Sequence, residues 1–175
     1  MKNTFYKTAA LAILIQCMGY VSAQSVSAEA TSTADILPAI QVTSNVDLHF
    51  GDIMSHYFYP DVVRINLTGE NRISVLGWST LLPSDDGQPA EFTATGSPDR
   101  LFTITLPGNY DVYLSRDLGG GTDMRLENFV SDPSGFSSFD GTGSCELRIG
   151  AQLVVGANQL EGWYSGTYDI TLEYY

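Results

Sequence analysis

Two histidines are the only side chains of this sequence that are suited to acid–base catalysis at neutral pH. His49 alternates out of phase with Leu48 and Phe50, so we expect its ring to face solvent. His56 lies in the loop before Tyr57. Nucleophilic catalysis needs a base beside a serine or cysteine, and no Gly-x-Ser-x-Gly motif is present. The sequence therefore predicts a protein that is not an enzyme.

Acidic residues in two glycine-rich loops are the candidates for a metal site. Calcium binds several oxygen ligands from flexible loops, and the candidates are Asp117, Asp123, Asp132 and Asp140. Their spacing does not match an EF-hand, and Asp and Gly are also the ordinary residues of turns, so both interpretations stay open. Neither a helix pattern nor a lysine follows the glycines at 119–121, so we expect no phosphate loop and no cofactor.

Aromatic residues in loops suggest a third kind of site, a platform on which sugar rings could stack. The candidates are Tyr57, Tyr59 and Trp163, and Trp163 lies between two glycines, where a large ring is expected to be exposed. For Trp78 and Tyr164 the alternative is that they fill a β-sandwich core, as aromatic side chains commonly do. We favour core packing over a ligand platform.

Short strands are the elements that must position these side chains. Apolar residues alternate with polar ones at 40–42, 46–50, 63–67, 73–77, 92–94, 102–106, 110–114 and 124–129. Such alternation is typical of strands with one buried face. No stretch shows a sustained helical period with caps. Many short strands with glycine-rich turns predict an all-β fold, an antiparallel β-sandwich.

The last third of the sequence carries the clearest strand pattern. It predicts two short strands, at 145–149 and 153–155, and a longer closing strand at 168–174, with glycines where the chain turns or is closely approached. Cys145 has the phase of Leu147 and Ile149, so we expect it to point into the core. An intermolecular disulfide or a reactive thiol is the alternative.

The first 23 residues have the pattern of a signal peptide. Two lysines precede an apolar stretch at 9–15. The sequence Val-Ser-Ala at 21–23 has small residues at the positions that a signal peptidase recognises, so cleavage is expected between Ala23 and Gln24. Lipidation at Cys17 is the rival interpretation. Removal of residues 1–23 leaves six arginines against 20 acidic residues, a net charge of −14. Such a chain repels nucleic acid, and no later segment is long and apolar enough for a membrane helix.

The sequence after the cleavage site divides into a leader, residues 24–37, and one β-sandwich domain, residues 38–175. The leader is rich in Ala, Ser and Thr, so we expect it to be flexible. Val26, Ala28 and Ala30 alternate weakly, and the leader could add as a strand to the edge of a neighbour's sheet.

The order of these features resembles the DUF4402 family of bacterial exported proteins. The resemblance rests on 48–51 (Leu-His-Phe-Gly), 102–107 (a strand ending in proline) and the closing stretch from 149 to 174, with Gln159, Gly162, Tyr164, Gly166 and Tyr168. It implies an immunoglobulin-like sandwich similar to fimbrial subunits and spore-coat-type proteins, and it brings no established catalytic residues. Classical chaperone–usher pilins carry an early disulfide that this chain lacks, which puts that assembly pathway in doubt.

These observations together favour a structural or interaction protein, such as a pilin-like or cell-surface subunit, secreted to the bacterial periplasm, surface or medium. Its partners would be copies of itself or other surface subunits, joined by pairing of edge strands. The alternative function is a carbohydrate- or calcium-dependent adhesion module that uses the aromatic and acidic loops.

Overall fold

The computed structural model describes residues 27–68 and 72–175, and within these ranges it contains strands and no helix. The strands are β1 (Gln41–Val46), β2 (Ile53–Met54), β3 (Asp61–Ile65), β4 (Arg72–Ser74), β5 (Thr80–Leu81), β6 (Ala90–Thr95), β7 (Leu101–Thr105), β8 (Val112–Arg116), β9 (Met124–Asp132), β10 (Phe136–Ser138), β11 (Ser144–Val155), β12 (Tyr164–Ser165) and β13 (Thr171–Tyr174). The expected cleavage site between Ala23 and Gln24 lies outside the described residues.

Contacts divide the chain into residues 1–35 and residues 36–175. Of the first unit, the described residues 27–35 form neither strand nor helix and are exposed to solvent. The second unit holds all the strands of the described residues, and we call it the domain.

An 8-stranded antiparallel sheet is built around β11, in the order β1-β6-β11-β9-β8-β12, with β3 and β4 attached beside β11. β9 pairs along one edge of β11. The other edge is shared, because residues 144–149 pair with β6 and residues 152–155 pair with β3. Every second side chain of β11, from Leu147 to Val155, is buried on one face. This long strand therefore supports the core along its whole length.

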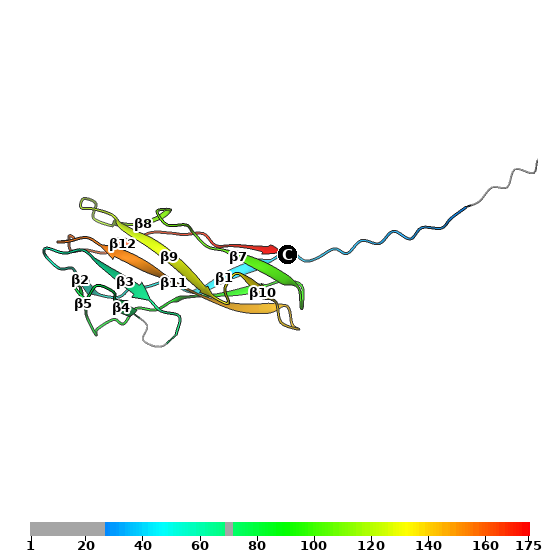
Figure 1. The fold of residues 1–175 in the computed structure, drawn as a ribbon, viewed down its shortest axis with the longest axis horizontal. Coiled ribbons are helices and arrows are strands. Elements are labelled where there is room, and N and C mark those ends of the chain that lie inside the picture. The colour runs from blue at the N-terminus through cyan, green and yellow to red at the C-terminus, as the bar shows by residue number, and fades with distance from the viewer. Residues whose placement is uncertain (1–26, 69–71) are drawn as a thin grey trace, which may run out of the picture. The chain divides into compact units, whose positions relative to one another are not determined.

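One half of the sandwich is closed by a second sheet, of order β10-β7-β13. Ala94 and Leu147 of the large sheet pack here against Phe102 of β7 and Phe139, and the rings of Phe102 and Phe139 lie 4.5 Å apart. We call this part the closed half. Figure 1 shows β7 and β10 at one end of the domain and β2, β5 and β12 at the other.

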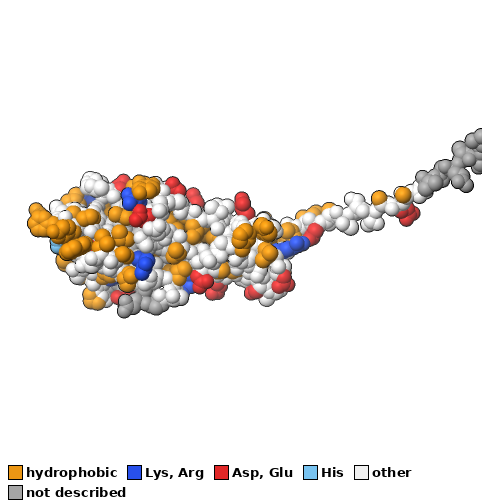
Figure 2. Space-filling model, in the orientation of Figure 1, with side chains coloured by type: hydrophobic (Ala, Val, Ile, Leu, Met, Phe, Trp, Pro, Cys, Tyr) orange, Lys and Arg blue, Asp and Glu red, His pale blue; other side chains and the backbone are white. Residues whose placement is uncertain are grey.

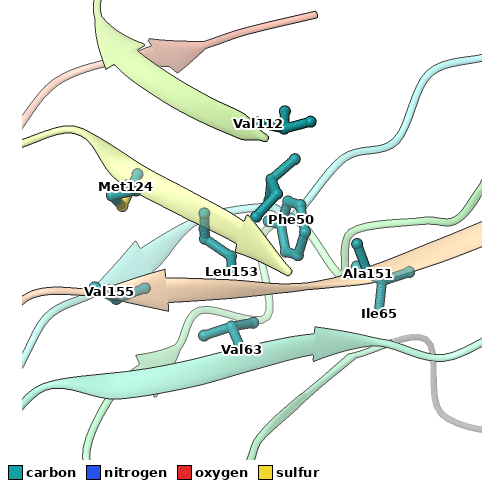
Figure 3. Packing of buried hydrophobic residues seen from close by; sticks show 9 residues of the cluster. Phe50, Val63, Ile65, Val112, Met124, Ala151, Leu153 and Val155 are labelled. Carbon is teal, nitrogen blue, oxygen red and sulfur yellow. The ribbon is translucent and has the colours of Figure 1, made fainter. Parts of the chain in front are cut away.

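The other half of the core, which we call the open half, has a smaller second layer, in which the two-stranded sheet β2-β5 is joined by irregular segments. Figure 3 shows Leu153 of β11 beside Phe50, which comes from an irregular segment. The buried residues of this cluster are Phe50, Val63, Ile65, Val112, Met124, Leu126, Ala151, Leu153 and Val155. Partly buried residues cover the cluster, among them Ile53 of β2, Leu81 of β5 and Tyr164 of β12.

The predicted antiparallel all-β sandwich is confirmed, but several strand boundaries differ from the expectation. The two short strands at 145–149 and 153–155 are one continuous strand, β11. Gly150 lies inside it and is a close-approach position, because a Cβ there would come within 2.6 Å of the Ile65 carbonyl oxygen. The closing strand β13 has only 4 residues, and 48–50 is not a strand. Cys145 packs partly buried against the closed half, as its phase predicts.

Candidate functional site

A groove lies over the open half of the domain, and its floor is the apolar face of the large sheet. Strands β8, β9 and β11 supply the floor residues, which are Leu114, Met124, Leu126, Leu153 and Val155. They share this face because side chains alternate along each strand. Met124, Leu126, Leu153 and Val155 are at most 8% exposed, because side chains of both walls, among them Ile53 and Tyr164, pack against them.

Residues 47–55 form the first wall of the groove. His49 and Gln88 each donate a backbone amide hydrogen bond to the carbonyl oxygen of the other. Ile53 and Met54, which form β2, pair with β5. The guanidinium of Arg72, which is 9% exposed, donates hydrogen bonds to the carbonyl oxygens of Phe50 (2.7 Å), Asp52 (3.0 Å) and Leu82 (2.5 Å). A single buried side chain thus joins the carbonyl oxygens of this wall to that of Leu82, beside β5.

Residues 159–168 form the second wall. Tyr164 and Ser165 make up β12, which pairs with β8, and Arg116 donates to the carbonyl oxygen of Glu161 at 2.7 Å. The Gln159 amide bonds to the hydroxyl of Tyr164 at 2.9 Å. These bonds fix the wall from the side of β8.

The groove between the two walls has a volume of about 1100 Å³ and is partly open to solvent. Small-molecule sites typically enclose ~300–1,000 Å³, so this volume is large for one small ligand. β12 is the last strand of the large sheet, so among the described residues its outer edge pairs with no strand, and both its residues line the groove. The groove therefore combines an apolar floor with unpaired main-chain groups on one wall.

His49 lies at the rim of the groove, where its Nε2 is 2.5 Å from Asp85 Oδ2 and its ring stacks on that of Trp163, 6.2 Å away. Its side chain is 36% exposed, so the expected solvent contact is only partial. The hydrogen bonds from His49 and from the Gly87 amide lower the pKa of Asp85. In the described part of the chain, the bonds of His49 lead to no serine or cysteine.

The loop aromatics gather in a second place, which we call the aromatic cluster: His56, Tyr57, Phe58, Tyr59 and Trp78. The rings of Tyr59 and Trp78 lie 4.6 Å apart, and the amides of Phe58 and Tyr59 donate to Nδ1 of His56. Figure 2 shows hydrophobic side chains gathered at the end where Figure 1 places β2, β5 and β12.

The predicted platform of Tyr57, Tyr59 and Trp163 is divided by the structure. Tyr57 and Tyr59 belong to the aromatic cluster, whereas Trp163 contacts His49 at the groove. The expectation that Trp78 packs in the core is wrong, since this side chain is 47% exposed, while Tyr164 does pack against the core. Trp78 is exposed because it lies in the turn after the short strand β4, beyond the sheet face.

Asp61 holds the turn that carries Trp78. Its carboxylate is 1% exposed and accepts hydrogen bonds from the Ser74 hydroxyl and from the amides of Leu76, Trp78 and Ser79. Burial acts to raise the pKa of Asp61, but these hydrogen bonds outweigh it and hold the pKa below its usual value. The carboxylate therefore stays charged and holds the backbone of the turn from Leu76 to Ser79.

The four acidic calcium candidates do not form a cluster. Among the residues that the structure describes, no group of three or more His, Cys, Asp or Glu side chains could hold a metal ion. Asp140 accepts hydrogen bonds from Thr142 and Ser144 in its own turn, which lower its pKa, and Asp117 accepts one from Ser165. Asp123 directly precedes β9, and Asp132 is the last residue of that strand.

A family model described as Domain of unknown function (DUF4402) matches residues 40–174. The chain belongs to the DUF4402 family. The DUF4402 match spans both walls of the groove and the aromatic cluster, and it begins after the leader. No curated protein and no solved structure gives a significant match. The resemblance noted in the sequence is confirmed at the level of the family.

Sequence reasoning missed the two buried charges of this DUF4402 domain, Asp61 and Arg72. Each stands at the start of a short strand, where a charged residue is usually taken to face solvent. It also missed the groove, because an alternating pattern shows that a face is apolar but not what covers it.

Within the described ranges, no helix has the length and apolar character needed to cross a bilayer.

Proposed function

We propose that this protein is an exported, non-enzymatic interaction subunit of a bacterial surface, and that its groove binds an extended segment of a protein chain. The observation that carries the proposal is the groove itself, an opening of about 1100 Å³ in the second layer of a sandwich whose other half is closed by strands. A strand placed there would complete the layer.

The chemistry of the groove suits a strand better than a small polar ligand. A bound strand gains affinity from main-chain hydrogen bonds and specificity from side chains that enter pockets alternately. The outer edge of β12 supplies main-chain groups, and Met54, Leu160 and Trp163 supply exposed apolar side chains on the two walls. For the non-enzymatic part, the hydrogen bonds of the two histidines in the described residues lead to Asp85 and to backbone amides, and to no serine or cysteine side chain.

Peptide binding tests this proposal. Two sets of 12-residue synthetic peptides with equal composition are compared, one with alternating apolar residues and one with the same residues clustered. We expect only the alternating set to bind, and Thr167→Arg to weaken the binding at least tenfold by filling the groove. Thr122→Arg is the matched control, because Thr122 is exposed and does not line the groove.

Hydrogen exchange on the same samples locates the bound peptide. We expect slower exchange of the amides at 163–168 when an alternating peptide is present. Equal binding of the two peptide sets, or equal losses in the two arginine variants, would show that the groove is not a strand site.

The aromatic cluster favours a second candidate function, carbohydrate binding. Tyr57 and Phe58 are 66% and 72% exposed, and an exposed group of large rings commonly marks a binding surface. A glycan array identifies ligands, and we expect Trp78→Ala to abolish binding while Trp163→Ala leaves it unchanged. An array without any hit would remove this candidate.

For calcium dependence, no observation favours one set of ligands. Calorimetry with calcium chloride tests whether the protein binds calcium.

A further inference from the structure

Three segments of the domain contain no charged residue. Residues 53–60, 73–84 and 156–160 include no Asp, Glu, Lys or Arg, although 16% of the whole chain is charged. Asp61, which follows the first of these segments, is buried and bonded to the turn that carries Trp78. In a chain with 20 acidic and 8 basic residues, so long an uncharged sequence in three pieces is unusual.

Backbone and ring contacts bring the three segments together. Strand β2 pairs with β5, and the rings of Tyr59 and Trp78 lie 4.6 Å apart. The Asn158 amide donates a hydrogen bond of 2.8 Å to the carbonyl oxygen of His56. The segments therefore form one surface, which we call the uncharged end. It includes the aromatic cluster, and in Figure 2 hydrophobic side chains gather at the end of the domain where Figure 1 places β2 and β5.

The side chains that the uncharged end presents to solvent are large and apolar. Met54, Tyr57, Phe58 and Leu76 are each between 55% and 72% exposed. Tyr57 and Phe58 do not line the groove, and their rings meet edge to face, at 86°. These two rings are thus exposed outside the groove and give no flat platform. An exposed apolar surface of this kind marks a contact with another molecule.

The most exposed loop of the uncharged end already has hydrogen-bond partners for its backbone. The amides of Phe58 and Tyr59 donate to Nδ1 of His56, at 3.1 and 3.2 Å. Polar groups with partners can leave water at a small cost, so this loop is suited to an apolar environment. A specific sugar site instead needs polar groups that are directed at the ligand. The Gln159 side-chain amide of the third segment is already bonded to the hydroxyl of Tyr164.

We propose that the uncharged end docks on the surface of a lipid bilayer whose headgroups carry no net charge. Tyr and Trp rings are suited to the interface of a bilayer, because they are apolar but carry one polar group. Phe58 and Met54 can enter the boundary of the acyl chains, about 5–10 Å deep. An anionic bilayer would repel this acidic chain, so charge favours zwitterionic lipid. Because Phe58 and Trp78 do not line the groove, this inference does not depend on strand binding.

Co-sedimentation with phosphatidylcholine vesicles tests the proposal. The full chain is purified after export, and mass spectrometry verifies its N-terminus, since the apolar stretch at 9–15 would itself bind lipid. We expect wild-type protein to bind, and Phe58→Glu to weaken the binding about tenfold or more. Phe136→Glu is the matched control, because Phe136 is 64% exposed but lies on β10, in the second sheet of the closed half. Addition of anionic phosphatidylglycerol to the vesicles should weaken wild-type binding.

Tryptophan fluorescence locates the contact without a change in the uncharged end. The variant Trp163→Phe leaves Trp78 as the remaining tryptophan of the chain. We expect phosphatidylcholine vesicles to shift its emission to shorter wavelength, and lipids with brominated acyl chains to quench it.

Three results would overturn the proposal. The first is a wild-type protein that does not bind phosphatidylcholine vesicles, and the second is an equal loss of binding in the two glutamate variants. The third is glycan binding or self-association that depends on Phe58 while vesicles are not bound, which would assign the uncharged end to a sugar or to a second copy. The peptide experiment on the groove is unaffected by any of these results, so the two proposals fail separately.

Discussion

The closed and open halves of the domain share one long strand but are covered in different ways. In the closed half two sheets meet, and Phe102, Phe139 and Leu147 are at most 1% exposed between them. In the open half the second layer consists of the short strands β2, β5 and β12 with irregular segments, and the buried charges Asp61 and Arg72 bind backbone groups. Hydrophobic packing stabilises both halves, and in the open half polar side chains also position backbone segments.

This difference shows what a smaller second layer requires of a fold. Backbone groups near a core must find hydrogen-bond partners, and strands supply those partners to one another. Where strands are missing, a buried carboxylate can accept from several amides, and a guanidinium can donate to several carbonyl oxygens.

The largest expected effect comes from removing the charge of Asp61. Asp61→Asn should lower the free energy of unfolding by about 4 kcal/mol. The amide group of asparagine has one NH2 in place of a carboxylate oxygen, so some of the buried donors that now bind Asp61 would lose their acceptor. Urea unfolding monitored by tryptophan fluorescence measures the loss. A loss below about 1 kcal/mol would mean that the open half does not depend on this polar contact.

The same substitution removes a pH dependence. The pKa of Asp61 is lowered below 3.8 in the folded protein, so its stabilising contribution is complete above that pH and is lost as the pH falls further. Wild-type stability should therefore decline more steeply below pH 3.8 than that of Asp61→Asn. Asp140→Asn is the control, because Asp140 also has a lowered pKa but lies exposed in a turn, where we expect a smaller change.

A matched pair of leucines compares the two halves directly. Leu147→Ala in the closed half should cost about 3 kcal/mol, since the change leaves a cavity between two sheets. Leu153→Ala should cost about 2 kcal/mol, because the space that it leaves joins the groove and water can enter. Urea unfolding of both variants measures the difference. Equal costs would indicate that the floor of the open half is packed as tightly as the closed half.

The sequence predicted the strands of the closed half well, because alternation and buried packing agree there. Phe102 and Leu147 alternate strictly, and both are buried between the sheets. It failed at 145–155, where Gly150 suggested a break between two strands but lies within one. Glycine is also used where two backbones approach closely, and only the position of β3 distinguishes that role from a turn.

The candidate site could be predicted less well, because its residues meet only in the folded chain. His49 and Asp85 are 36 residues apart, and Asp61 reaches 18 residues to the Ser79 amide. No local pattern encodes these pairs. The exposed ring of Trp163 did follow from its neighbouring glycines, since the residue is 65% exposed, but its contact with His49 depends on the fold of two distant segments.

A smaller effect is expected where the closed half joins the leader. The Tyr174 hydroxyl donates to the Pro38 carbonyl oxygen and accepts from the Ser97 amide at 2.7 Å. Tyr174→Phe removes both bonds and should lower the free energy of unfolding by about 1 kcal/mol. Tyr175→Phe is the control, because Tyr175 is 81% exposed and its loss of a hydroxyl should change stability by less than ~0.5 kcal/mol. Equal effects would show that the Tyr174 hydroxyl has no stabilising role.

The smallest effect concerns Tyr168, whose phenol is partly buried at the groove in the open half. Burial, together with the nearby Asp47, raises the pKa of Tyr168 to about 12. The unfolded chain releases this proton from about pH 10, so the contribution of Tyr168 to stability is complete below pH 10 and is lost as the pH rises toward 12. Ultraviolet titration of the folded protein should show a late phenolate step that Tyr168→Phe removes and Tyr175→Phe does not. An ordinary titration near pH 10 would mean that water already fills this part of the groove, and the open half would then be more open than its packing indicates.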